Sequence, residues 1–309
     1  MSVLAISTDK LSPKLLELFA SQVPGVEFRL WPDIGDPAKI EYALAWKPPP
    51  GELAKLPKLK AILSFAAGVD HLASDPQLPK HIPVVRAVSE ASRLTMSGFC
   101  VAQVLRYQHR LNLYEQFQRQ GIWKQLPPRD MTETRVGVLG MGVLGADLAM
   151  RLQALGFAVN GWSRSKRAFD GVTMFHGADG LLPCMAASNV VVCLLPLTDE
   201  TRGILDAKAF AAMPKDGYVV NVARGGHVVA ADLVTALDSG HLEGATLDVF
   251  EPEPLPPESP LWRHPKIVVT PHTSGRMTNQ RVALNLIEML REVLSGKKLA
   301  NVVDWDKGY

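Results

Sequence analysis

Residues 134–156, "TRVGVLGMGVLGADLAMRLQALG", decide the fold of a large part of this chain. An apolar run leads into a G-x-G-x-x-G motif at Gly140, Gly142 and Gly145, and a helical stretch follows as far as Gly156. A strand, this motif and a helix, in that order, form the phosphate-binding turn of dinucleotide-binding domains. The first glycine permits the tight turn, the second lets the backbone approach a pyrophosphate, and the third lets the helix pack against the strand.

The start of a helix offers free N–H groups and the positive end of a dipole, and both favour phosphates. We therefore expect the loop and the first turn of the helix to bind a dinucleotide. The alternative is a tight strand-to-helix turn without a ligand. The expected contacts come from Gly140, Met141, Gly142, Val143, Leu144 and Gly145.

The end of the next strand indicates which dinucleotide binds. Sites selective for NAD place Asp or Glu there to accept a hydrogen bond from the ribose 2′-hydroxyl. The stretch "FAVNGWSRSKR" instead places Ser163, Arg164 and Ser165 there, and the nearest acid is Asp170. Hydroxyl and guanidinium groups suit a 2′-phosphate. NADPH is thus the preferred cofactor, with NADH possible, and a solvated basic turn is the alternative.

Apolar runs alternate with helical stretches along much of the chain, which predicts α/β folding around parallel sheets. The second series of runs begins at the glycine motif and fits a Rossmann-type doubly wound sheet. A proline-free stretch at 91–119 predicts one long helix, and 278–295 predicts a final amphipathic helix. In the second series we expect strands at 135–140, 157–163, 190–195, 218–222, 244–250 and 266–270.

The bulk composition excludes several classes of function. The chain has 309 residues, which suggests two domains, and its formal net charge is +2 without a long basic run. We expect no nucleic-acid partner. Three cysteines without C-x-x-C pairing, and an N-terminus without a signal peptide, favour the cytoplasm. No apolar run is long enough to span a bilayer, and no H-E-x-x-H motif indicates a metal site.

Polar residues follow several of the predicted strands. Arg224 lies in "NVARGG", Asp248 near the next strand end, Glu253 in the loop beyond it, and His272 in "TPHTSG". Because ligands of open α/β sheets bind beyond the carboxyl ends of the strands, these side chains are expected at one edge. Reduction of a carbonyl by hydride needs an acid for the oxygen and a cation to orient the substrate.

Each of these residues also has a simpler explanation. Arg224 alone fits a surface ion pair, Asp248 a turn cap, and His272 a structural histidine. Glu251 and Glu258 compete with Glu253 for any role in the loop. The shared position at the strand ends favours function over these readings.

The order and spacing of "VGVLGMGVLG", "LLPLTDETRGIL", "NVARGG", "LDVFEPEPL" and "TPHTSG" resemble the D-2-hydroxyacid dehydrogenases. "LPPESPLWRHP", "LAWKPPPG", "FAAGVDHL" and the tail "VVDWDKGY" resemble the glyoxylate/hydroxypyruvate reductase A branch of that family. The resemblance implies that Arg224 binds the substrate, that His272 is the general acid/base, and that Glu253 is its partner.

The resemblance also implies further contacts. Asp248 would lie near the nicotinamide, and Ala67, Gly68 and Val69 would offer backbone amides to the substrate carboxylate. The family often has glycine where this chain has Ala66. Trp46 is expected to wall the substrate pocket, or else to be a packed core indole. The remaining expected cofactor contacts are Leu195, Pro196, Thr201, Ala223 and Gly275.

The domain organisation follows from the same resemblance. Residues 1–98 and 276–309 would form a smaller flavodoxin-like α/β substrate domain, and 99–275 the inserted NAD(P)-binding domain. The active cleft would lie where the two meet. The helix at 91–119 would join the domains and contribute to a homodimer.

The predicted reaction is the NADPH-dependent reduction of a small 2-oxo acid, glyoxylate or hydroxypyruvate, to a 2-hydroxy acid. Arg224 would polarise the carbonyl and protonated His272 would supply the proton, while Glu253 orients the ring and favours the imidazolium. One alternative is a reductase of a bulkier aryl or branched 2-oxo acid. The other is a nucleotide-sensing regulatory protein of the same fold.

Overall fold

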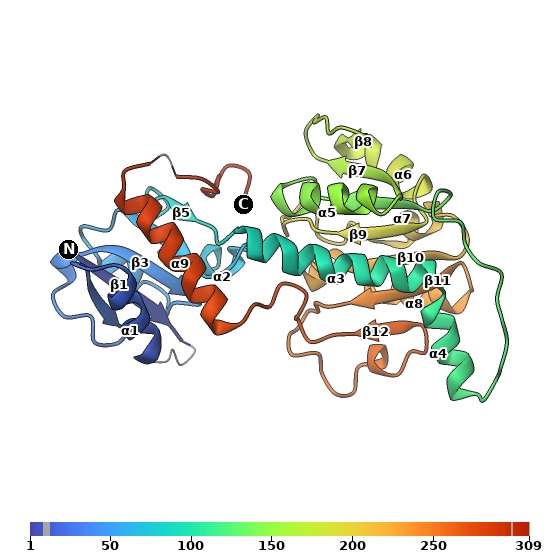
Figure 1. Ribbon diagram of the computed structural model, residues 1–309, viewed down its shortest axis with the longest axis horizontal. Helices are drawn as coiled ribbons and strands as arrows, with labels where there is room; N and C mark the ends of the chain where they lie inside the picture. The colour runs from blue at the N-terminus through green and yellow to red at the C-terminus, as the bar shows by residue number, and fades with distance from the viewer. Residues whose placement is uncertain (9–12, 298, 309) are drawn as a thin grey trace. The chain divides into compact units, whose positions relative to one another are not determined.

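The computed structural model describes residues 1–8, 13–297 and 299–308 and divides into two compact units (Figure 1). Unit 1 comprises Met1–Ser92 and Met277–Tyr309, and unit 2 comprises Arg93–Arg276. The assignment of unit 1 to the substrate and of unit 2 to the cofactor stays a prediction. Positions 9–12, 298 and 309, which belong to the predicted substrate domain, lie outside the described residues.

Unit 1 is built on a five-stranded parallel sheet within its described residues, in the order β2-β1-β3-β4-β5. Successive residues of β1 face opposite sides: Val3 packs on the side of α1 and α9, and Leu4 on the other. Both sides are therefore buried, as parallel sheets require. The strands are β1 (Ser2–Ser7), β2 (Glu27–Leu30), β3 (Ile40–Trp46), β4 (Ala61–Ser64) and β5 (Val84–Val85); the helices are α1 (Pro13–Gln22), α2 (Asp70–Ala73) and α9 (Asn279–Leu294).

Unit 2 contains a seven-stranded parallel sheet in the order β12-β11-β10-β9-β6-β7-β8, which confirms the doubly wound prediction. β8 was not predicted, and the strand expected at 244–250 lies at Leu242–Leu247. The strands are β6 (Arg135–Leu139), β7 (Ala158–Ser163), β8 (Val172–His176), β9 (Val190–Cys193), β10 (Gly217–Asn221), β11 (Leu242–Leu247) and β12 (Ile267–Val269).

Helices cover both faces of this second sheet (Figure 1). Val192 and Val220 pack on the side of α3 and α5, whereas Val191 and Val219 pack on the side of α6, α7 and α8. The buried valines explain the near-continuous apolar runs in the sequence. The helices are α3 (Glu90–Gln108), α4 (Leu111–Arg119), α5 (Val143–Ala154), α6 (Gly177–Ala186), α7 (Ala207–Ala212) and α8 (Ala230–Asp238).

The prediction of one helix over 91–119 is wrong, because the chain breaks between α3 and α4. Arg110 adopts a left-handed conformation with φ of 55°, which an uninterrupted helix does not allow. Glu243 holds the break in place: Asn112 Nδ2 donates to its Oε1 at 3.0 Å, and Arg129 forms an ion pair with its Oε2 at 2.5 Å. These partners lie far along the chain, so the local sequence does not reveal the break.

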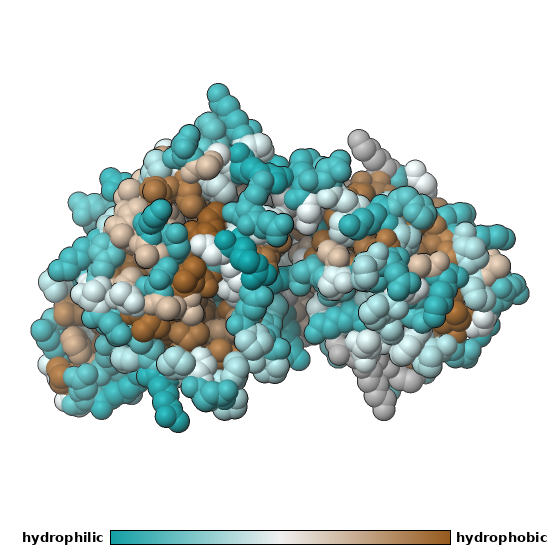
Figure 2. Space-filling view, turned by 180° about the vertical axis from the view of Figure 1, so that it is seen from behind, coloured by the Kyte–Doolittle hydropathy of each residue, from teal (hydrophilic) through white to brown (hydrophobic). Residues whose placement is uncertain are grey.

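The surface of unit 2 carries some of its apolar side chains (Figure 2). Trp123, in the segment after α4, is 97% exposed. None of the helices within the described ranges combines the length and apolar character needed to cross a membrane. Among the same residues, no group of three or more His, Cys, Asp or Glu side chains is placed to hold a metal ion.

Candidate active site

The glycine loop joins β6 to α5 and has the geometry that its sequence predicts. Gly140 has φ of 103°, and a Cβ there would lie 2.8 Å from the carbonyl oxygen of Leu194. At Gly145 a Cβ would lie 2.0 Å from the carbonyl oxygen of Gly140, so any side chain would push the helix off the strand. The first and third glycines therefore meet steric demands that no other residue satisfies.

The middle of this loop is open and suits a phosphate group. Gly142 precedes α5 and provides no side-chain cap, and a Cβ there would meet nothing within 4 Å. The first N–H groups of a twelve-residue helix thus have no side-chain acceptor at the position before the helix. These are the features needed for a dinucleotide pyrophosphate, so the loop fits such a cofactor.

The basic loop after β7 faces the same strand edge. Ser163 is buried, and its hydroxyl donates to the carbonyl oxygen of Ser165 at 2.8 Å, so it shapes the turn. Arg164 pairs with Glu200 at 3.3 Å. Arg167 Nη1 donates to the carbonyl oxygen of Met141 at 3.1 Å and so connects this loop to the glycine loop. The contacts of Glu200 and Arg167 join segments that are distant in sequence, so no local pattern predicts them.

The segment after β9 forms a turn that is held by its own side chains. Leu195 is buried, and Thr201 Oγ1 donates to the carbonyl oxygen of Pro196 at 2.7 Å. The same hydroxyl accepts from the backbone N–H of Thr198 at 2.9 Å. Thr201, expected as a cofactor contact, therefore has a structural role in fixing Pro196 at the strand end.

Arg224 lies just beyond the carboxyl end of β10, at the start of a 3-10 turn over Gly225–His227. Its carbonyl oxygen accepts from Asn221 Nδ2 at 2.8 Å, and its Nη1 donates to the carbonyl oxygen of Ala223 at 2.6 Å. The backbone N–H of Ala223 donates to Asn221 Oδ1 at 3.2 Å. Asn221, at the end of the buried strand, thus organises the backbone on both sides of the predicted substrate arginine.

Asp248 immediately follows β11 and is fully buried. Its Oδ1 accepts from the N–H of Thr273 at 2.8 Å and from Thr270 Oγ1 at 2.5 Å, and its Oδ2 accepts from the N–H of Ser274 at 2.8 Å. Buried carboxylates need such donors. The side chain of Asp248 therefore organises the loop that carries His272.

His272 is held in a left-handed conformation with φ of 53°, and its N–H donates to the carbonyl oxygen of Asp248 at 2.8 Å. Its Nδ1 lies 2.8 Å from Glu253 Oε2, and the two side chains are 47% and 36% exposed. An ionised carboxylate only accepts, so Nδ1 carries the hydrogen in this pair. Glu253 Oε1 accepts from the N–H of Phe250 at 2.9 Å, which fixes the carboxylate.

These contacts distinguish Glu253 from Glu251, one of its two competitors in the loop. Glu251 forms an ion pair with Arg202 at 2.6 Å, whereas Glu253 faces His272. Arg224, Asp248 and His272 follow β10, β11 and β12, which are neighbours in a parallel sheet. The structure therefore brings the predicted catalytic residues of unit 2 to one sheet edge. Gly275, beyond His272, is exposed at the surface of the unit.

The predicted substrate contacts of unit 1 lie at one edge of its own sheet. Trp46 ends β3, and residues 67–69 follow the neighbouring β4 and lead into α2. The indole of Trp46 packs on the ring of His71, with 4.7 Å between centroids. Ala66 is tied back to Ser64, whose Oγ accepts from its N–H at 3.1 Å. Trp46 is half-buried and is not a fully packed core residue.

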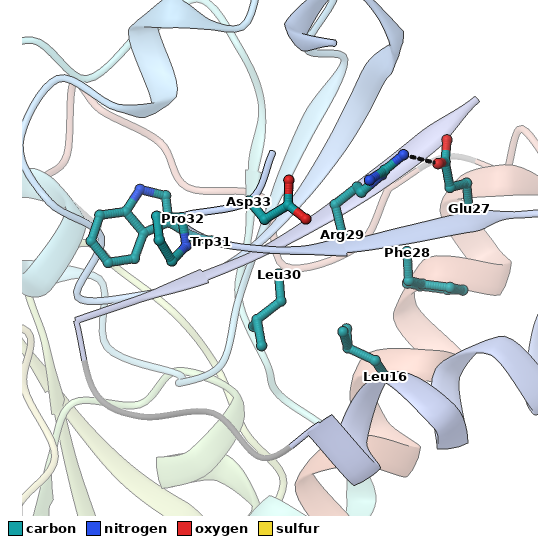
Figure 3. Close-up of a pocket in the computed structure, with 8 residues that line it drawn as sticks. All are labelled: Leu16, Glu27, Phe28, Arg29, Leu30, Trp31, Pro32 and Asp33. Carbon is teal, nitrogen blue, oxygen red and sulfur yellow. Dashed lines mark hydrogen bonds and ion pairs between the residues drawn. The ribbon is translucent and has the colours of Figure 1, made fainter. Parts of the chain in front are cut away.

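A hollow of about 610 Å³ lies elsewhere on unit 1, beside β2 (Figure 3). Two of its three charged side chains, Glu27 and Arg29, form an ion pair with each other. No nucleophile, histidine or glycine-rich turn lines it, so its described residues indicate no reaction. The lining residues are Leu16, Glu27, Phe28, Arg29, Leu30, Trp31, Pro32 and Asp33.

Comparison with known proteins identifies the family. Residues 101–274 match the family model for the D-isomer specific 2-hydroxyacid dehydrogenase, NAD binding domain. This chain belongs to the D-isomer-specific 2-hydroxyacid dehydrogenase family. The family predicted from the sequence motifs is thus confirmed. Among curated members, the glyoxylate/hydroxypyruvate reductase A of Photorhabdus laumondii is 40% identical over 294 residues, covering 93% of each chain.

Solved structures of 2-hydroxyacid dehydrogenases have the same fold. A family member from Xanthobacter autotrophicus, crystallised with NADPH and MES, is 40% identical with a TM-score of 0.93, covering 100% of this chain and 99% of the other. An NADPH-dependent glyoxylate/hydroxypyruvate reductase from Sinorhizobium meliloti, crystallised with NADP and sulfate, is 38% identical with a TM-score of 0.89, again covering 100% and 99%.

Proposed function

We propose that this 2-hydroxyacid dehydrogenase reduces small 2-oxo acids, glyoxylate and hydroxypyruvate, to 2-hydroxy acids with NADPH. The observation that carries the proposal is the contact between His272 Nδ1 and Glu253 Oε2 at 2.8 Å. This oriented imidazole follows β12, next to the strand ends that carry Asp248 and Arg224. Relatives named for this reaction, and structures crystallised with NADPH or NADP, support it.

NADPH, when bound, supplies the hydride that C2 of the substrate receives. Its pyrophosphate would bind at Gly142 and the start of α5, where the structure leaves space for it. Arg164 and Ser165 would recognise the 2′-phosphate, because a guanidinium makes strong charge-assisted hydrogen bonds to phosphate. Asp248 would act close to the nicotinamide through the loop that it organises.

Arg224 binds and orients the substrate in this mechanism. Its guanidinium donates to the carboxylate and to the carbonyl oxygen, and its positive charge stabilises the negative charge that develops on that oxygen. Asn221 Nδ2, which donates to the carbonyl oxygen of Arg224 at 2.8 Å, keeps the base of the side chain fixed. The arginine thereby lowers the barrier by positioning as well as by charge.

His272 delivers the proton. With Nδ1–H directed at Glu253, the second ring nitrogen, Nε2, holds the proton that passes to the alkoxide oxygen. The carbonyl C=O then becomes C–H and O–H, and the imidazole is left neutral. Glu253 orients the ring and compensates its charge before the transfer. In unit 1, we assign binding of the substrate carboxylate to the backbone amides of Ala67, Gly68 and Val69, and part of the pocket wall to Trp46.

The test is the absorbance of NADPH at 340 nm with a panel of 2-oxo acids. Glyoxylate and hydroxypyruvate should be reduced with the highest kcat/KM, and NADH should serve less well. Faster reduction of aryl or branched pyruvates would instead indicate a bulkier substrate. Binding of NADPH without turnover of any 2-oxo acid would contradict the enzymatic proposal and favour a nucleotide-sensing regulator.

A cytoplasmic homodimer is the second part of the proposal. Leu111 on α4, and Ile122 and Trp123 in the segment after it, are large apolar side chains that are exposed at the surface. Exposed aromatic and apolar residues of this kind are typical of interfaces. A second copy of the chain would cover them. Three free cysteines suit a reducing compartment. Light scattering should give twice the chain mass, and Trp123→Ala should weaken the dimer whereas Trp262→Ala should not; a monomeric wild type would contradict it.

A further inference from the structure

His227 is a fully buried histidine three residues after Arg224, and none of the roles assigned above uses it. It ends the 3-10 turn that follows β10. Its ring lies between two backbone segments. Nδ1 is 3.2 Å from the backbone nitrogen of Arg224 and 3.0 Å from its carbonyl oxygen, and Nε2 is 3.2 Å from the carbonyl oxygen of Pro196.

The partners of the ring determine its protonation. Each ring nitrogen lies near a carbonyl oxygen, which only accepts, and a neutral ring has one N–H to donate. With the hydrogen on Nε2, the ring donates to Pro196 and also accepts the N–H of Arg224, whereas with the hydrogen on Nδ1 it only donates to the carbonyl oxygen of Arg224. The Nε2–H form therefore makes more hydrogen bonds, and in it the carbonyl oxygen of Arg224 accepts from Asn221 instead of from the ring. Burial lowers the pKa of His227, which favours this neutral form. Both ring nitrogens are thus satisfied, and each is committed to a different segment.

The His227 ring thus forms a bridge between the Arg224 N–H and the carbonyl oxygen of Pro196, and other hydrogen bonds fix both ends of this bridge. The carbonyl oxygen of Pro196 also accepts from Thr201 Oγ1 at 2.7 Å. The turn itself is tied to the same loop, because the N–H of Leu205 donates to the carbonyl oxygen of His227 at 2.9 Å. Asn221 holds the carbonyl oxygen of Arg224 while His227 accepts from its N–H. The two side chains therefore clamp both polar groups of the Arg224 backbone.

We propose that His227 is a positioning residue that sets the backbone of Arg224, and so its guanidinium, relative to the Pro196 turn. The proposal rests on the proposed role of Arg224 in substrate binding. A displaced guanidinium would bind a 2-oxo acid less well, since bidentate recognition of a carboxylate is sensitive to geometry. Loss of the Nδ1 acceptor should therefore weaken binding of the substrate and leave binding of the cofactor unchanged.

Two substitutions separate the ends of the bridge. In His227→Asn, the side-chain oxygen replaces Nδ1 as the acceptor for the Arg224 N–H. In His227→Gln, the amide nitrogen replaces Nε2 as the donor to Pro196, and the acceptor is lost. We expect His227→Gln to raise the KM for glyoxylate about tenfold with an unchanged Kd for NADPH, and His227→Asn to keep that KM within about twofold.

His241→Gln is the matched control. The Nε2 of His241 also donates to a backbone carbonyl oxygen in unit 2, that of Phe210 at 3.0 Å. As in His227→Gln, the amide nitrogen can replace Nε2 as the donor while the ring is lost, so the two variants should lower the melting temperature similarly. His241→Gln should leave the KM for glyoxylate unchanged. Equal kinetic effects of His227→Gln and His227→Asn, or a KM effect in His241→Gln, would overturn the proposal.

A double-mutant cycle distinguishes this proposal from the assignment of Arg224 itself. In an Arg224→Ala background, His227→Gln should change the KM for glyoxylate no further, because the side chain that it positions is gone. A KM that is unaffected by Arg224→Ala alone would refute the role of Arg224 instead. Should the His227 variants not fold, nitrogen NMR of the wild-type ring decides: the Nε2–H tautomer is expected, and an Nδ1–H ring would overturn the proposal.

Discussion

Gly225 and Phe250 pack backbone against backbone: a Cβ built on Gly225 would lie 2.0 Å from the carbonyl carbon of Phe250. Gly225 directly follows Arg224, and the N–H of Phe250 donates to Glu253. The turn after the arginine thus rests on the segment that fixes the partner of His272. The spacing between the arginine and the glutamate–histidine pair is set by this contact as well as by the sheet.

Gly225→Ala should force the two segments apart. A contact at 2.0 Å to backbone cannot be relieved by turning a side chain, so the turn carrying Arg224 must move. We expect kcat/KM for glyoxylate to fall by about 10²-fold, because misplaced catalytic groups lose rate steeply. Gly98→Ala in α3, where a Cβ meets nothing within 4 Å, is the control. Wild-type kinetics for Gly225→Ala would show that the spacing does not matter.

His272→Ala should lower kcat by about 10²–10⁴-fold, as expected for loss of a general acid. Glu253→Gln should cause a smaller loss, since the amide still contacts Nδ1 without charge. His264→Ala is the matched control, because His264 also contacts a carboxylate, Asp238 at 3.2 Å, but before β12 begins. Unchanged turnover of His272→Ala would remove this histidine from the mechanism.

Substitutions of Arg164 and of Glu200 should change the KM for NADPH in opposite directions. Arg164→Ala should raise the KM for NADPH much more than the KM for NADH, because the 2′-phosphate loses its cation. Glu200→Gln should lower the KM for NADPH about two- to fivefold, since Glu200 competes with the phosphate for Arg164. Arg135→Ala, at the amino end of β6, controls for the change in net charge. Equal effects on both cofactors would contradict 2′-phosphate recognition.

The parts of the fold that the sequence predicts are those that local patterns encode. The glycine loop is one, because the φ of Gly140 and the contact of Gly145 with Gly140 arise within a few residues. The apolar runs of β9 and β10 are another, since valines buried on both faces leave few alternatives to a parallel strand. The family motifs then locate Arg224 and His272 at the strand ends.

The missed features depend on partners that are distant in sequence. The break at Arg110 is stabilised by Glu243, and the pairing of Glu251 with Arg202 removes it from competition with Glu253. The sequence does not reveal the contacts of His227, because its polar partners are backbone atoms, one of them at Pro196. β8 is a short edge strand whose half-buried pattern resembles a loop. Neither hydrogen bonds to backbone acceptors nor ion pairs between residues distant in sequence leave a periodic signal in the sequence.

The buried ring of His227 should also make stability depend on pH. Burial, together with the charges of Arg224 and Arg202, lowers its pKa below the usual value for histidine, about 6.5. As the pH falls below about 6.5, the unfolded chain binds a proton there that the folded chain does not, so the free energy of unfolding decreases until the lower folded pKa is reached. Above 6.5 both states are neutral at this residue and the effect vanishes. The loss is at most about 1.4 kcal/mol per pH unit for one proton.

Urea unfolding at pH 7.5 and pH 5.5 measures this dependence in the wild type and in His227→Asn, which has no titrating ring at this position. The wild type should lose more stability between the two pH values than the variant does, because the other histidines titrate equally in both. Equal losses would mean that His227 takes up a proton in the folded state. In that case the imidazolium would donate from both nitrogens, and Arg224 would lose the acceptor for its backbone N–H.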